Sequence, residues 1–498
     1  MNRRLVLLAS ALAAIAVLSR LPFVTHILWQ WDSVLYARAL EQGFHVDYLP
    51  SLQRPHPPGY IFYVALAALF DLVLQDSNAA LVAVSILGTA LAVVAIFLFA
   101  RRFSGLGPAT IAAAGYAFSP LVWLYGEVAY PYALLGFLAV ALAATFYEAR
   151  RRTPRWRLAA SLLFGLAAGF RQDVLVLFSP LWVWMMWRGD WRERITAALA
   201  VAVACLAWFV PSALLSGGVE RYLTAVVQQS TGVGIAYSVP GNGFQALSYN
   251  LRFTLYGLAW GLFAFAILLA GLALAPVLWW ARHGQWRLRL HADNAFFILW
   301  IASPLAFYIA IHIGEWGYLL TILPGLYVLI AALLPRLVRP LRGMARGSWR
   351  VLAAGLVASG ALVFLYVPDA RFSADAVHDH DVAIAAKVDY IRTNFAPDAT
   401  IVLAREDYLQ VRYYLSEYSA WLYDPDPYVA ATVKRHKKMP QKATTVVLFS
   451  KGLQPMQPQD LQYALVAPDV TLAYFVVEPG TVLEFAGTRF GVREASAR

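Results

Sequence analysis

Ionisable side chains gather directly after the first apolar run of this sequence. Asp32 lies in Trp31-Asp32-Ser33, and a second group occupies the run Arg54-Pro55-His56-Pro57-Pro58-Gly59-Tyr60. A carboxylate at the edge of an apolar region is partly desolvated, which raises its proton affinity and suits it to general-base catalysis. Cations fixed in a proline-rich turn are suited to binding a phosphate. The two segments therefore predict a base, Asp32, and an anion site that contains Arg54 and His56.

Each of these residues also has an ordinary structural explanation. Aspartate is a favoured N-cap, and Asp32 would cap a helix that begins at Ser33. Arg54 and His56 would contact lipid headgroups or cap the helix that follows their turn. The sequence leaves these interpretations open, and the capping and catalytic roles of Asp32 are compatible.

Further candidates lie in short turns between the later apolar runs. We expect Glu127 to act as a second acid, with an ordinary loop acid as the alternative. Arg171 lies two residues before Asp173, and such a pair this close to lipid is costly unless it has partners or a role. The residues expected to contact a sugar or an acceptor are Tyr36, Tyr60, Tyr130, His312 and Glu315.

A metal site is the less favoured interpretation of His312 and Glu315. Their spacing of three residues suits two ligands, but one such pair is a weak motif. The sequence also lacks a P-loop, a dinucleotide fingerprint, HExxH and a nucleophile elbow. We therefore expect no required cofactor, with a divalent metal as the alternative.

The composition is that of a membrane protein with many spans. Of the 498 residues, 60% are hydrophobic and 14% are charged, whereas about 25% are charged in average soluble proteins. The net charge of +11 resides in short clusters between apolar runs, which indicates membrane topology rather than a nucleic-acid surface. Cys205 is the single cysteine, so a disulfide framework within the chain is excluded.

Apolar runs of about 20 residues predict the membrane spans. We predict eleven, at 5–24, 79–100, 109–126, 128–148, 157–170, 172–187, 195–216, 252–281, 294–313, 317–335 and 350–367. We interpret the first as a retained helix rather than a signal peptide, because Ser19-Arg20-Leu21-Pro22 is a poor cleavage site. The apolar run 59–74 is short and acidic at its end, and we expect it on the outer surface as a juxtamembrane or re-entrant helix.

The arginine distribution sets the expected topology. With the N-terminus inside, the inner segments hold twenty arginines, and the first span and outer loops hold six. Counting 59–74 as a span would invert every later loop and break this pattern. The long outer segment 217–251 is rich in glycine, serine, amides and aromatic residues, which suits either carbohydrate contacts or any exposed loop.

The composition changes after Val367. Residues 368–498 carry ordinary charge density, and we expect an extracytoplasmic α/β domain there, after a membrane domain at 1–367. A helix is predicted at 383–395, and strands are predicted at 400–404, 444–449 and 471–477. The basic run 434–438 is predicted to be a solvated helix end, with anionic lipid contact as the alternative.

The order of these motifs resembles the GT-C superfamily of membrane glycosyltransferases. It is similar to the branch of the protein O-mannosyltransferases and the lipid A aminoarabinose transferase (glycosyltransferase family 39). The resemblance covers residues 1–367. Its motifs are Trp31-Asp32-Ser33 after the first span, His56-Pro57-Pro58-Gly59-Tyr60, and Gly317-Tyr318-Leu319-Leu320-Thr321-Ile322-Leu323-Pro324 near the last paired spans.

The resemblance implies transfer of a sugar from a polyprenyl-phosphate donor to an acceptor hydroxyl on the outer face, with inversion. Asp32 would match the family's acid in the first loop, and Glu127 is similar in place to a second acid. His56 stands where relatives have lysine, so Arg54 or Arg171 would hold the donor phosphate. The implied partners are the donor, membrane lipids and an acceptor lipid, glycan or protein, with no nucleic acid.

The expected location is a bacterial plasma membrane with the C-terminal domain outside. A transporter or flippase of lipids or glycans is the alternative function. It predicts charged residues inside the spans and paired broken helices, and the sequence shows neither pattern. A structural or sensory protein would leave Asp32 and the turn at 54–56 without a role.

Overall fold

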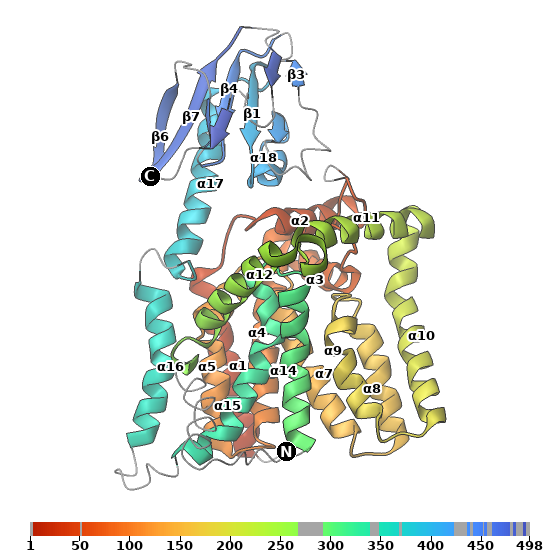
Figure 1. Ribbon diagram of the computed structural model, residues 1–498. Coiled ribbons are helices and arrows are strands. Elements are labelled where there is room, and N and C mark those ends of the chain that lie inside the picture. Colours follow the sequence, from red (N-terminus) through yellow and green to blue (C-terminus); the bar gives the residue numbers. More distant parts are fainter. Residues whose placement is uncertain are drawn as a thin grey trace. The chain divides into compact units, whose positions relative to one another are not determined.

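The computed structural model describes residues 3–49, 52–266, 292–338, 348–367, 371–422, 436–438, 442–451, 453–455, 461–478, 482–484 and 492–494. They form two compact units (Figure 1). The first contains Met1–Val24 and Ala39–Val377, and the second contains Thr25–Arg38 with His378–Arg498. Helix α2 (Trp31–Gln42) crosses the division between them.

The first unit is helical. Its described α-helices are α1 (Arg3–Leu18), α3 (Ile61–Leu74), α4 (Ser77–Ala100), α5 (Leu106–Ala117), α6 (Pro120–Tyr125), α7 (Tyr132–Ala149), α8 (Pro154–Ala167), α9 (Val174–Met186), α10 (Trp191–Leu215), α11 (Val219–Tyr237), α12 (Val239–Leu262), α14 (Ala292–Ala310), α15 (Leu323–Val338) and α16 (Ser348–Tyr366). Among the described residues, five segments are long and apolar enough to cross a membrane: Arg3–Phe23, Ser77–Ala100, Tyr132–Ala149, Trp191–Leu215 and Asp293–Ala310. These helices confirm the predicted polytopic helical class, and the number of spans stays a prediction.

Small residues let the upright helices approach closely. A Cβ added at Gly88 of α4 would lie 2.4 Å from the backbone nitrogen of Leu134 in α7. A Cβ at Gly165 of α8 would lie 2.5 Å from the carbonyl oxygen of Val201 in α10. Close backbone approach at small residues is the usual way in which membrane helices associate.

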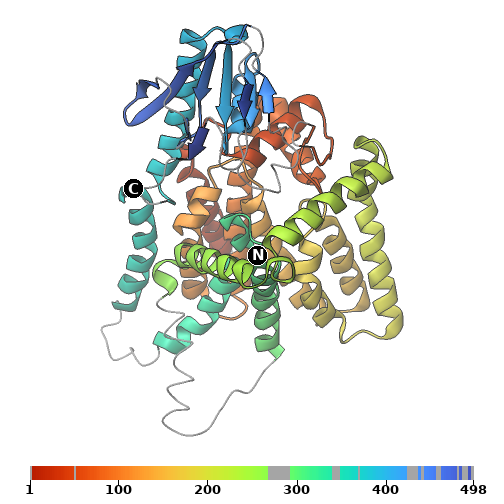
Figure 2. The same ribbon diagram turned by 45° about the horizontal axis from the view of Figure 1, so that its top comes forward.

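Three predicted segments differ from the structure. The run 109–126 forms two helices, α5 and α6, with a break at Phe118 and Ser119. The run 317–335 begins as the 3-10 helix η2 (Trp316–Thr321) before α15. The predicted loop 217–251 is mostly helical, in α11 and the first part of α12, which is kinked at Asn242 and Gly243. These helices lie across the upright ones (Figures 1 and 2).

The physical reason for the third difference lies in the pattern of α11. Its buried residues are Tyr222, Ala225 and Gly232, whereas Leu223, Val227 and Ile235 are exposed. Spacings of three, seven and ten residues are helical, and they supply a buried stripe that composition alone does not reveal. Of the predicted span 252–281, residues 267–281 lie outside the described residues.

The second unit is an α/β fold. Its main sheet has the strand order β2-β1-β4-β7-β6. The strands are β1 (Thr400–Ala404), β2 (Ser419–Leu422), β4 (Thr445–Leu448), β6 (Gln462–Ala467) and β7 (Val470–Val476). Strand β1 pairs in parallel with β2 and β4, and β7 pairs in antiparallel with β4 and β6. Two short ladders join β3 (His436–Lys438) to β8 (Val482–Glu484) and β5 (Leu453–Pro455) to β9 (Val492–Glu494).

Alternate residues of the sheet pack on opposite faces, as the period of two in a strand requires. Ile401 and Leu403 belong to one apolar cluster, and Val402 belongs to another that includes Ile384 and Val388. These last two lie on α17 (Ala374–Asn394), so this helix covers one face of the sheet. Helix α18 (Tyr408–Tyr414) adds Val411 to the same cluster.

The predicted helix and strands of this unit correspond to α17, β1, β4 and β7. The basic run 434–438 is described only from His436 to Lys438, where it forms β3 and not a helix end. Residues 434 and 435 lie outside the described residues. The segment before α2 joins this unit, because Asp381 accepts hydrogen bonds from the Thr25 hydroxyl at 2.6 Å and from the His26 backbone N–H at 2.5 Å.

Candidate active site

Arg171 is the centre of the candidate site in the first unit. It lies in the turn between α8 and α9, and only 6% of its side chain is exposed. Its Nε donates to Asp173 Oδ2 at 2.8 Å. Within the described part of the chain, its two terminal nitrogens have no hydrogen-bond acceptor. The guanidinium group is therefore fixed at one edge and able to donate at the other.

Three tyrosine rings surround this guanidinium group. Its central carbon lies 4.1 Å from the ring centroid of Tyr318, 5.2 Å from that of Tyr132 and 5.4 Å from that of Tyr60. Cation–π attraction of this kind stabilises a desolvated cation. Burial opposes the charged form of Arg171, but Asp173 and the three tyrosines together outweigh it, and the pKa of Arg171 lies well above its ordinary value.

Helix N-termini meet at this arginine. Tyr60 is the residue before α3, Tyr132 is the first residue of α7, and Asp173 precedes α9. None of these three termini has a side-chain capping hydrogen bond. The positive ends of helix dipoles and a buried arginine together favour an anion at this place.

Direct contacts position the turn that carries Arg171. The Gln172 amide donates to the carbonyl of Gly59 at 2.6 Å, and the Phe62 N–H donates to the carbonyl of Gly169 at 3.0 Å. A Cβ at Gly169 would lie 2.4 Å from the Phe62 ring, so glycine is needed for this approach. These bonds hold the start of α3, including Tyr60, against the Arg171 turn.

The motif at Gly317 and Tyr318 supplies the opposite wall. A Cβ at Gly317 would lie 2.1 Å from the ring of Tyr132. The missing side chain therefore lets η2 approach α7 and brings Tyr318 over Arg171. The Tyr125 hydroxyl donates to Glu315 Oε2 at 2.9 Å, which ties the start of η2 to the end of α6.

His312 and Tyr130 extend the aromatic cluster. His312 packs against Tyr318 and Tyr237, with centroid distances of 5.9 and 5.3 Å. It lies two residues beyond the end of α14, where burial and the charge of Arg171 lower its pKa to about 4. Tyr130 stacks on Tyr132 at 5.0 Å. Both predicted contact residues thus lie next to a ring that touches Arg171.

Two residues of the turn at 54–58 contact different parts of the first unit. The Arg54 guanidinium donates to the carbonyl of Gln42 at 2.8 Å, and its backbone pairs with His45. The His56 ring packs edge-on against Tyr60 at 5.5 Å, and its Nδ1 lies 2.7 Å from the carbonyl of Pro57. Of the predicted phosphate ligands, His56 therefore borders the Arg171 cluster through Tyr60, whereas the Arg54 guanidinium bonds to Gln42, the last residue of α2.

Glu127 occupies a buried position rather than an exposed loop. Its exposed fraction is 0%, and its carboxylate interacts electrostatically with the charge of Arg20. Both Glu127 carboxylate oxygens and Arg20 Nε are buried without a hydrogen-bond partner among the described residues. Arg20 itself donates to the carbonyl of Ala117 and lies over the Trp123 ring. The local sequence around Glu127 gives no sign of this arginine, which is 107 positions away in the chain.

Asp32 and Tyr36 lie on α2 within the second unit. Helix α2 begins at Trp31, so Asp32 is in its first turn and is not the residue before the helix. Asp32 is half-buried and Tyr36 is buried. The Trp31 ring contacts Tyr408 of α18 at 6.1 Å, which places the start of α2 against the α/β domain.

Sequence reasoning missed two residues of the arginine cluster as site residues, Tyr132 and Tyr318. A signal existed for each. Tyr132 belongs to a group with Tyr125 and Tyr130 around a turn, and Tyr318 follows the glycine of the motif at 317–324. Among the described residues, no group of three or more histidine, cysteine, aspartate or glutamate side chains could hold a metal ion.

Comparisons with known proteins identify the fold. Residues 48–195 match the model of the protein O-mannosyl-transferase TMEM260 N-terminal domain. The ArnT structure from Cupriavidus metallidurans bound to undecaprenyl phosphate superposes with a TM-score of 0.55 at 14% identity, over 95% of this chain and 97% of that chain. The Archaeoglobus fulgidus oligosaccharyltransferase in complex with Zn and sulfate superposes with a TM-score of 0.50 at 12% identity, over 89% of this chain and 67% of that chain.

The apo state of the same ArnT gives a TM-score of 0.53 at 14% identity, over 95% of this chain and 97% of that chain. No curated protein sequence matches the chain. The predicted resemblance is confirmed at the level of the fold, because the chain shares its fold with these glycosyltransferase structures and residues 48–195 match the O-mannosyl-transferase model.

Proposed function

We propose that this protein transfers a sugar from a polyprenyl-phosphate donor to an acceptor hydroxyl at the outer face of a bacterial plasma membrane, with inversion. The observation that carries the proposal is Arg171, a buried guanidinium group with unpaired terminal nitrogens among tyrosines and helix N-termini. Such a group suits the phosphate of a lipid-linked sugar. Support also comes from the fold, since a structural neighbour is bound to undecaprenyl phosphate.

The chemistry is a single displacement. The acceptor hydroxyl gives its proton to the Asp32 carboxylate, and its oxygen forms a bond to the anomeric carbon of the sugar. The bond between that carbon and the phosphate oxygen breaks, and the lipid phosphate leaves with the electron pair. Arg171 would stabilise the charge that develops on this phosphate, with His56 and Tyr60 beside it. Attack opposite to the leaving group inverts the anomeric centre.

Asp173 and the tyrosines prepare Arg171 for this role. The bond from Arg171 Nε to Asp173 fixes the guanidinium plane before the donor arrives, which reduces the ordering cost of binding. Tyrosine rings exclude water from the cation, so its attraction for a phosphate is stronger than at an exposed arginine. No nucleotide takes part, in keeping with the lack of nucleotide motifs in the sequence.

The test of the phosphate role replaces Arg171 by alanine and by lysine in the full-length protein. Undecaprenyl phosphate binding is measured by native mass spectrometry, and transfer is followed by mass spectrometry of envelope glycans and carrier lipids in cells. We expect Arg171→Ala to lower transfer by about 10²–10³-fold, as loss of one transition-state donor does. Arg102→Ala, at an exposed ion pair with Glu148, is the matched control. Wild-type lipid binding and glycans in Arg171→Ala would contradict the phosphate role.

The role of Asp32 is tested by Asp32→Asn. The amide preserves shape but cannot accept the acceptor's proton, so transfer should be lost while expression and thermal stability are kept. Asp389→Asn, an exposed acid on α17 of the same unit, serves as the control. Normal transfer in Asp32→Asn would exclude this residue as the base, and an unchanged carrier pool in cells that lack the protein would favour a transporter.

A further inference from the structure

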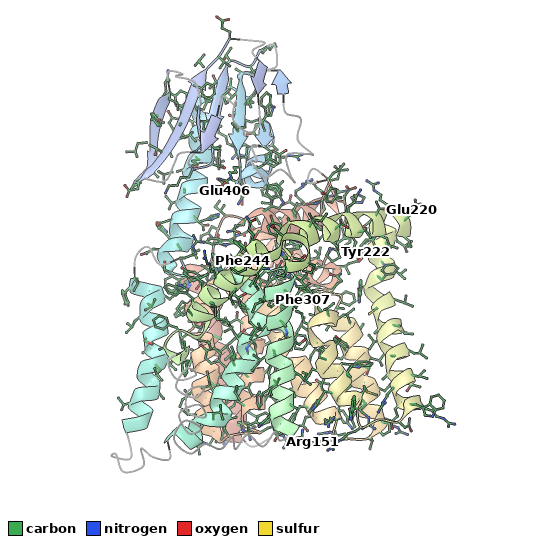
Figure 3. The ribbon with its side chains drawn as sticks, in the orientation of Figure 1. Arg151, Glu220, Tyr222, Phe244, Phe307 and Glu406 are labelled. Atoms are coloured by element: carbon green, nitrogen blue, oxygen red, sulfur yellow. The ribbon has the colours of Figure 1, made fainter. Side chains whose placement is uncertain are left out.

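An irregular segment of the second unit leads to Asp32. Residues 25–30 belong to no helix or strand, and α2 begins directly after them at Trp31. The backbone groups of such a segment need partners outside regular secondary structure. Side chains of the α/β fold supply these partners, from α17 and from α18, the helix that follows the turn labelled at Glu406 in Figure 3. The path of the chain into α2 therefore depends on these two helices.

Asp381 and its neighbour on α17 contact the first part of the segment. The Asp381 carboxylate accepts a hydrogen bond from the Thr25 hydroxyl at 2.6 Å and another from the His26 N–H at 2.5 Å. Hydrogen bonds to an ionised carboxylate are about twice as strong as those between neutral groups. The ring of His380 packs against that of Trp29, with centroids 4.5 Å apart. Two adjacent residues of one helix thus contact three residues of the segment.

Helix α18 binds the backbone of the segment closer to α2. The Tyr414 hydroxyl accepts a hydrogen bond from the Leu28 N–H at 2.9 Å, and the Gln410 amide donates to the carbonyl of Trp29 at 3.4 Å. Leu28 is 0% exposed and Gln410 is 1% exposed. Because both residues are buried, a shift of the segment would leave polar groups without partners, which costs free energy.

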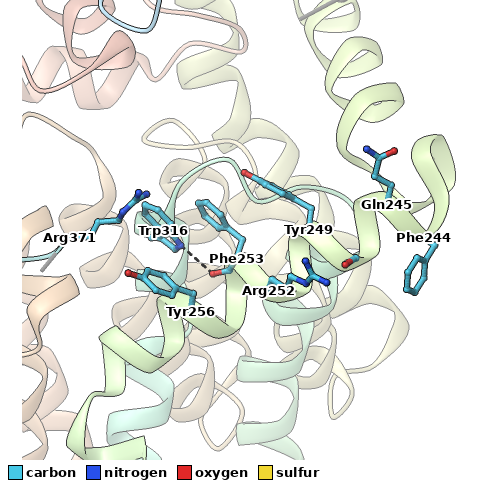
Figure 4. Close-up of a pocket in the computed structure, with 9 residues that line it drawn as sticks. Phe244, Gln245, Tyr249, Arg252, Phe253, Tyr256, Trp316 and Arg371 are labelled. Atoms are coloured by element: carbon cyan, nitrogen blue, oxygen red, sulfur yellow. Dashed lines mark hydrogen bonds between the residues drawn. The ribbon is translucent and has the colours of Figure 1, made fainter. Parts of the chain in front are cut away.

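The start of α17 is itself fixed in the first unit. Phe372 lies two residues before α17 and packs edge-on against Trp316, with centroids 5.4 Å apart. Arg371 lies over the Trp316 ring at 4.9 Å, and Figure 4 shows it beside this indole. Trp316 Nε1 donates to the carbonyl of Phe253 at 3.2 Å, so the indole is held in one orientation. Helix α17 therefore begins at a fixed point and continues through Asp381.

The contacts with the α/β fold end one residue before Asp32. The Trp31 ring lies 6.1 Å from that of Tyr408 of α18, and Asp32 follows in the first turn of α2. A general base acts when its carboxylate lies about 2.6–3.2 Å from the atom that carries the proton. A displacement of about 1 Å at the start of α2 would move the carboxylate out of this range. The contacts of α17 and α18 are therefore suited to keep Asp32 within it.

We propose that Asp381, Gln410 and Tyr414 are positioning residues for glycosyl transfer. They hold residues 25–31 and thereby keep Asp32 where it accepts the proton of the acceptor hydroxyl. The three residues act through Asp32 rather than on the substrate. The proposal rests on Asp32 as the base of the proposed function, and it gives the α/β fold a part in the reaction.

Hydrogen–deuterium exchange of the full-length protein in detergent tests the contact itself. Asp381→Ala removes both acceptor oxygens, so we expect amides of residues 25–31 to exchange about tenfold faster, as loss of one hydrogen bond to a charged group allows. Exchange in β1 and in the turn at Arg171 should stay as in the wild type. Asp389→Ala, at an exposed acid of the same helix, is the matched control and should leave the exchange of residues 25–31 unchanged.

Transfer is measured in the same variants by mass spectrometry of envelope glycans and carrier lipids. We expect Asp381→Ala to lower transfer about 10²-fold, as a misplacement of about 1 Å does. Undecaprenyl phosphate binding, followed by native mass spectrometry, should be retained because it depends on Arg171. General unfolding would lower both quantities, so the two measurements distinguish positioning from folding. Tyr414→Phe keeps the ring and removes one acceptor, so it should show the same pattern with a smaller loss, also where Asp381→Ala does not fold.

A double-mutant cycle tests whether Thr25 and Asp381 act as a pair. Thr25→Val removes the hydroxyl that bonds to Asp381 and keeps the shape of the side chain. The double variant should transfer as much as Asp381→Ala alone, because the bond from Thr25 is already lost there. Losses that add in full would count against the proposal and overturn it.

The outcomes separate this proposal from the function on which it rests. Lost transfer with wild-type exchange at residues 25–31 would overturn the proposal. Loss of undecaprenyl phosphate binding in both Asp381→Ala and Tyr414→Phe would show a purely structural role and overturn it as well. The proposed base fails by a different result, which is normal transfer in Asp32→Asn. Normal transfer in Asp381→Ala alongside lost transfer in Asp32→Asn would leave that base intact and refute only the positioning.

Discussion

Gly317→Ala is a single-methyl change that tests how the tyrosine wall of the Arg171 site is held. The alanine Cβ would lie 2.1 Å from Cδ2 and 2.4 Å from Cγ of Tyr132, and 2.9 Å from Cε1 of Tyr125. Carbon atoms in contact are about 3.5–4.0 Å apart. Removing the overlap therefore requires the Tyr132 ring or the chain at Gly317 to move by more than about 1 Å.

The magnitude follows from how tightly Tyr132 is packed. It is 1% exposed, and it contacts Tyr125 at 5.2 Å and Tyr130 at 5.0 Å. Forcing one carbon into such a site costs about 1–3 kcal/mol of folding free energy. Tyr132 also lies over Arg171, so the same displacement moves a ring of the proposed phosphate site. A misplacement of about 1 Å near the chemistry lowers turnover by about 10²-fold.

The assay compares Gly317→Ala with Gly355→Ala. No atom lies within 4 Å of a Cβ at Gly355, which is in the interior of α16. That control should gain about 0.5–1 kcal/mol from helix propensity and keep full transfer. Thermal unfolding and glycan transfer are measured for both variants. Wild-type stability and transfer in Gly317→Ala would refute the argument that glycine is required for the approach of η2 to α7.

Two further predictions concern single carboxylates. Asp173→Asn leaves Arg171 as a buried charge without its partner, so we expect a loss of about 3–5 kcal/mol in folding free energy and a loss of transfer, measured by thermal unfolding and glycan analysis. For Asp381, burial raises the pKa, but hydrogen bonds from its neighbours, Thr25 among them, outweigh this and lower it below 3.8. Its contribution to stability is complete above the pKa of the unfolded chain and is lost as the pH falls through the lower folded value. Thermal unfolding of wild type should therefore weaken more steeply below about pH 4 than that of Asp381→Asn, and equal slopes would contradict this.

The sequence was sufficient for the class of the protein and for much of its second unit. Runs of apolar residues determine which segments are too hydrophobic to stay in water. This property can be read from the sequence because it does not depend on contacts with other segments. The strands β1, β4 and β7 were also predictable, because a sheet covered on both faces buries successive residues, as in β1 and β4, and so leaves a dense run of apolar residues in the sequence. The motif order also carried the GT-C resemblance, which the fold confirms.

The loop at 217–251 shows where this kind of reasoning fails. Its glycine, serine and amide content is typical of loops, yet α11 and α12 form there. The helices are stabilised by partners elsewhere in the chain, such as the bond from the Tyr222 hydroxyl to the carbonyl of Pro58 at 2.8 Å. The helix propensity of a segment describes that segment in isolation. In the folded protein, tertiary contacts outweigh this propensity and decide whether a helix forms.

The sequence alone determined that cations, acids and aromatic residues stand in the turns beside apolar helices. Only the tertiary structure decided which cation became buried among aromatic rings. Arg54 and Arg171 were equal candidates for the phosphate, but Arg54 bonds to the carbonyl of Gln42, whereas Arg171 lies among Tyr60, Tyr132 and Tyr318. The physical reason is that these rings come from helix ends far apart in the chain, and packing the helices together brings them around one guanidinium group.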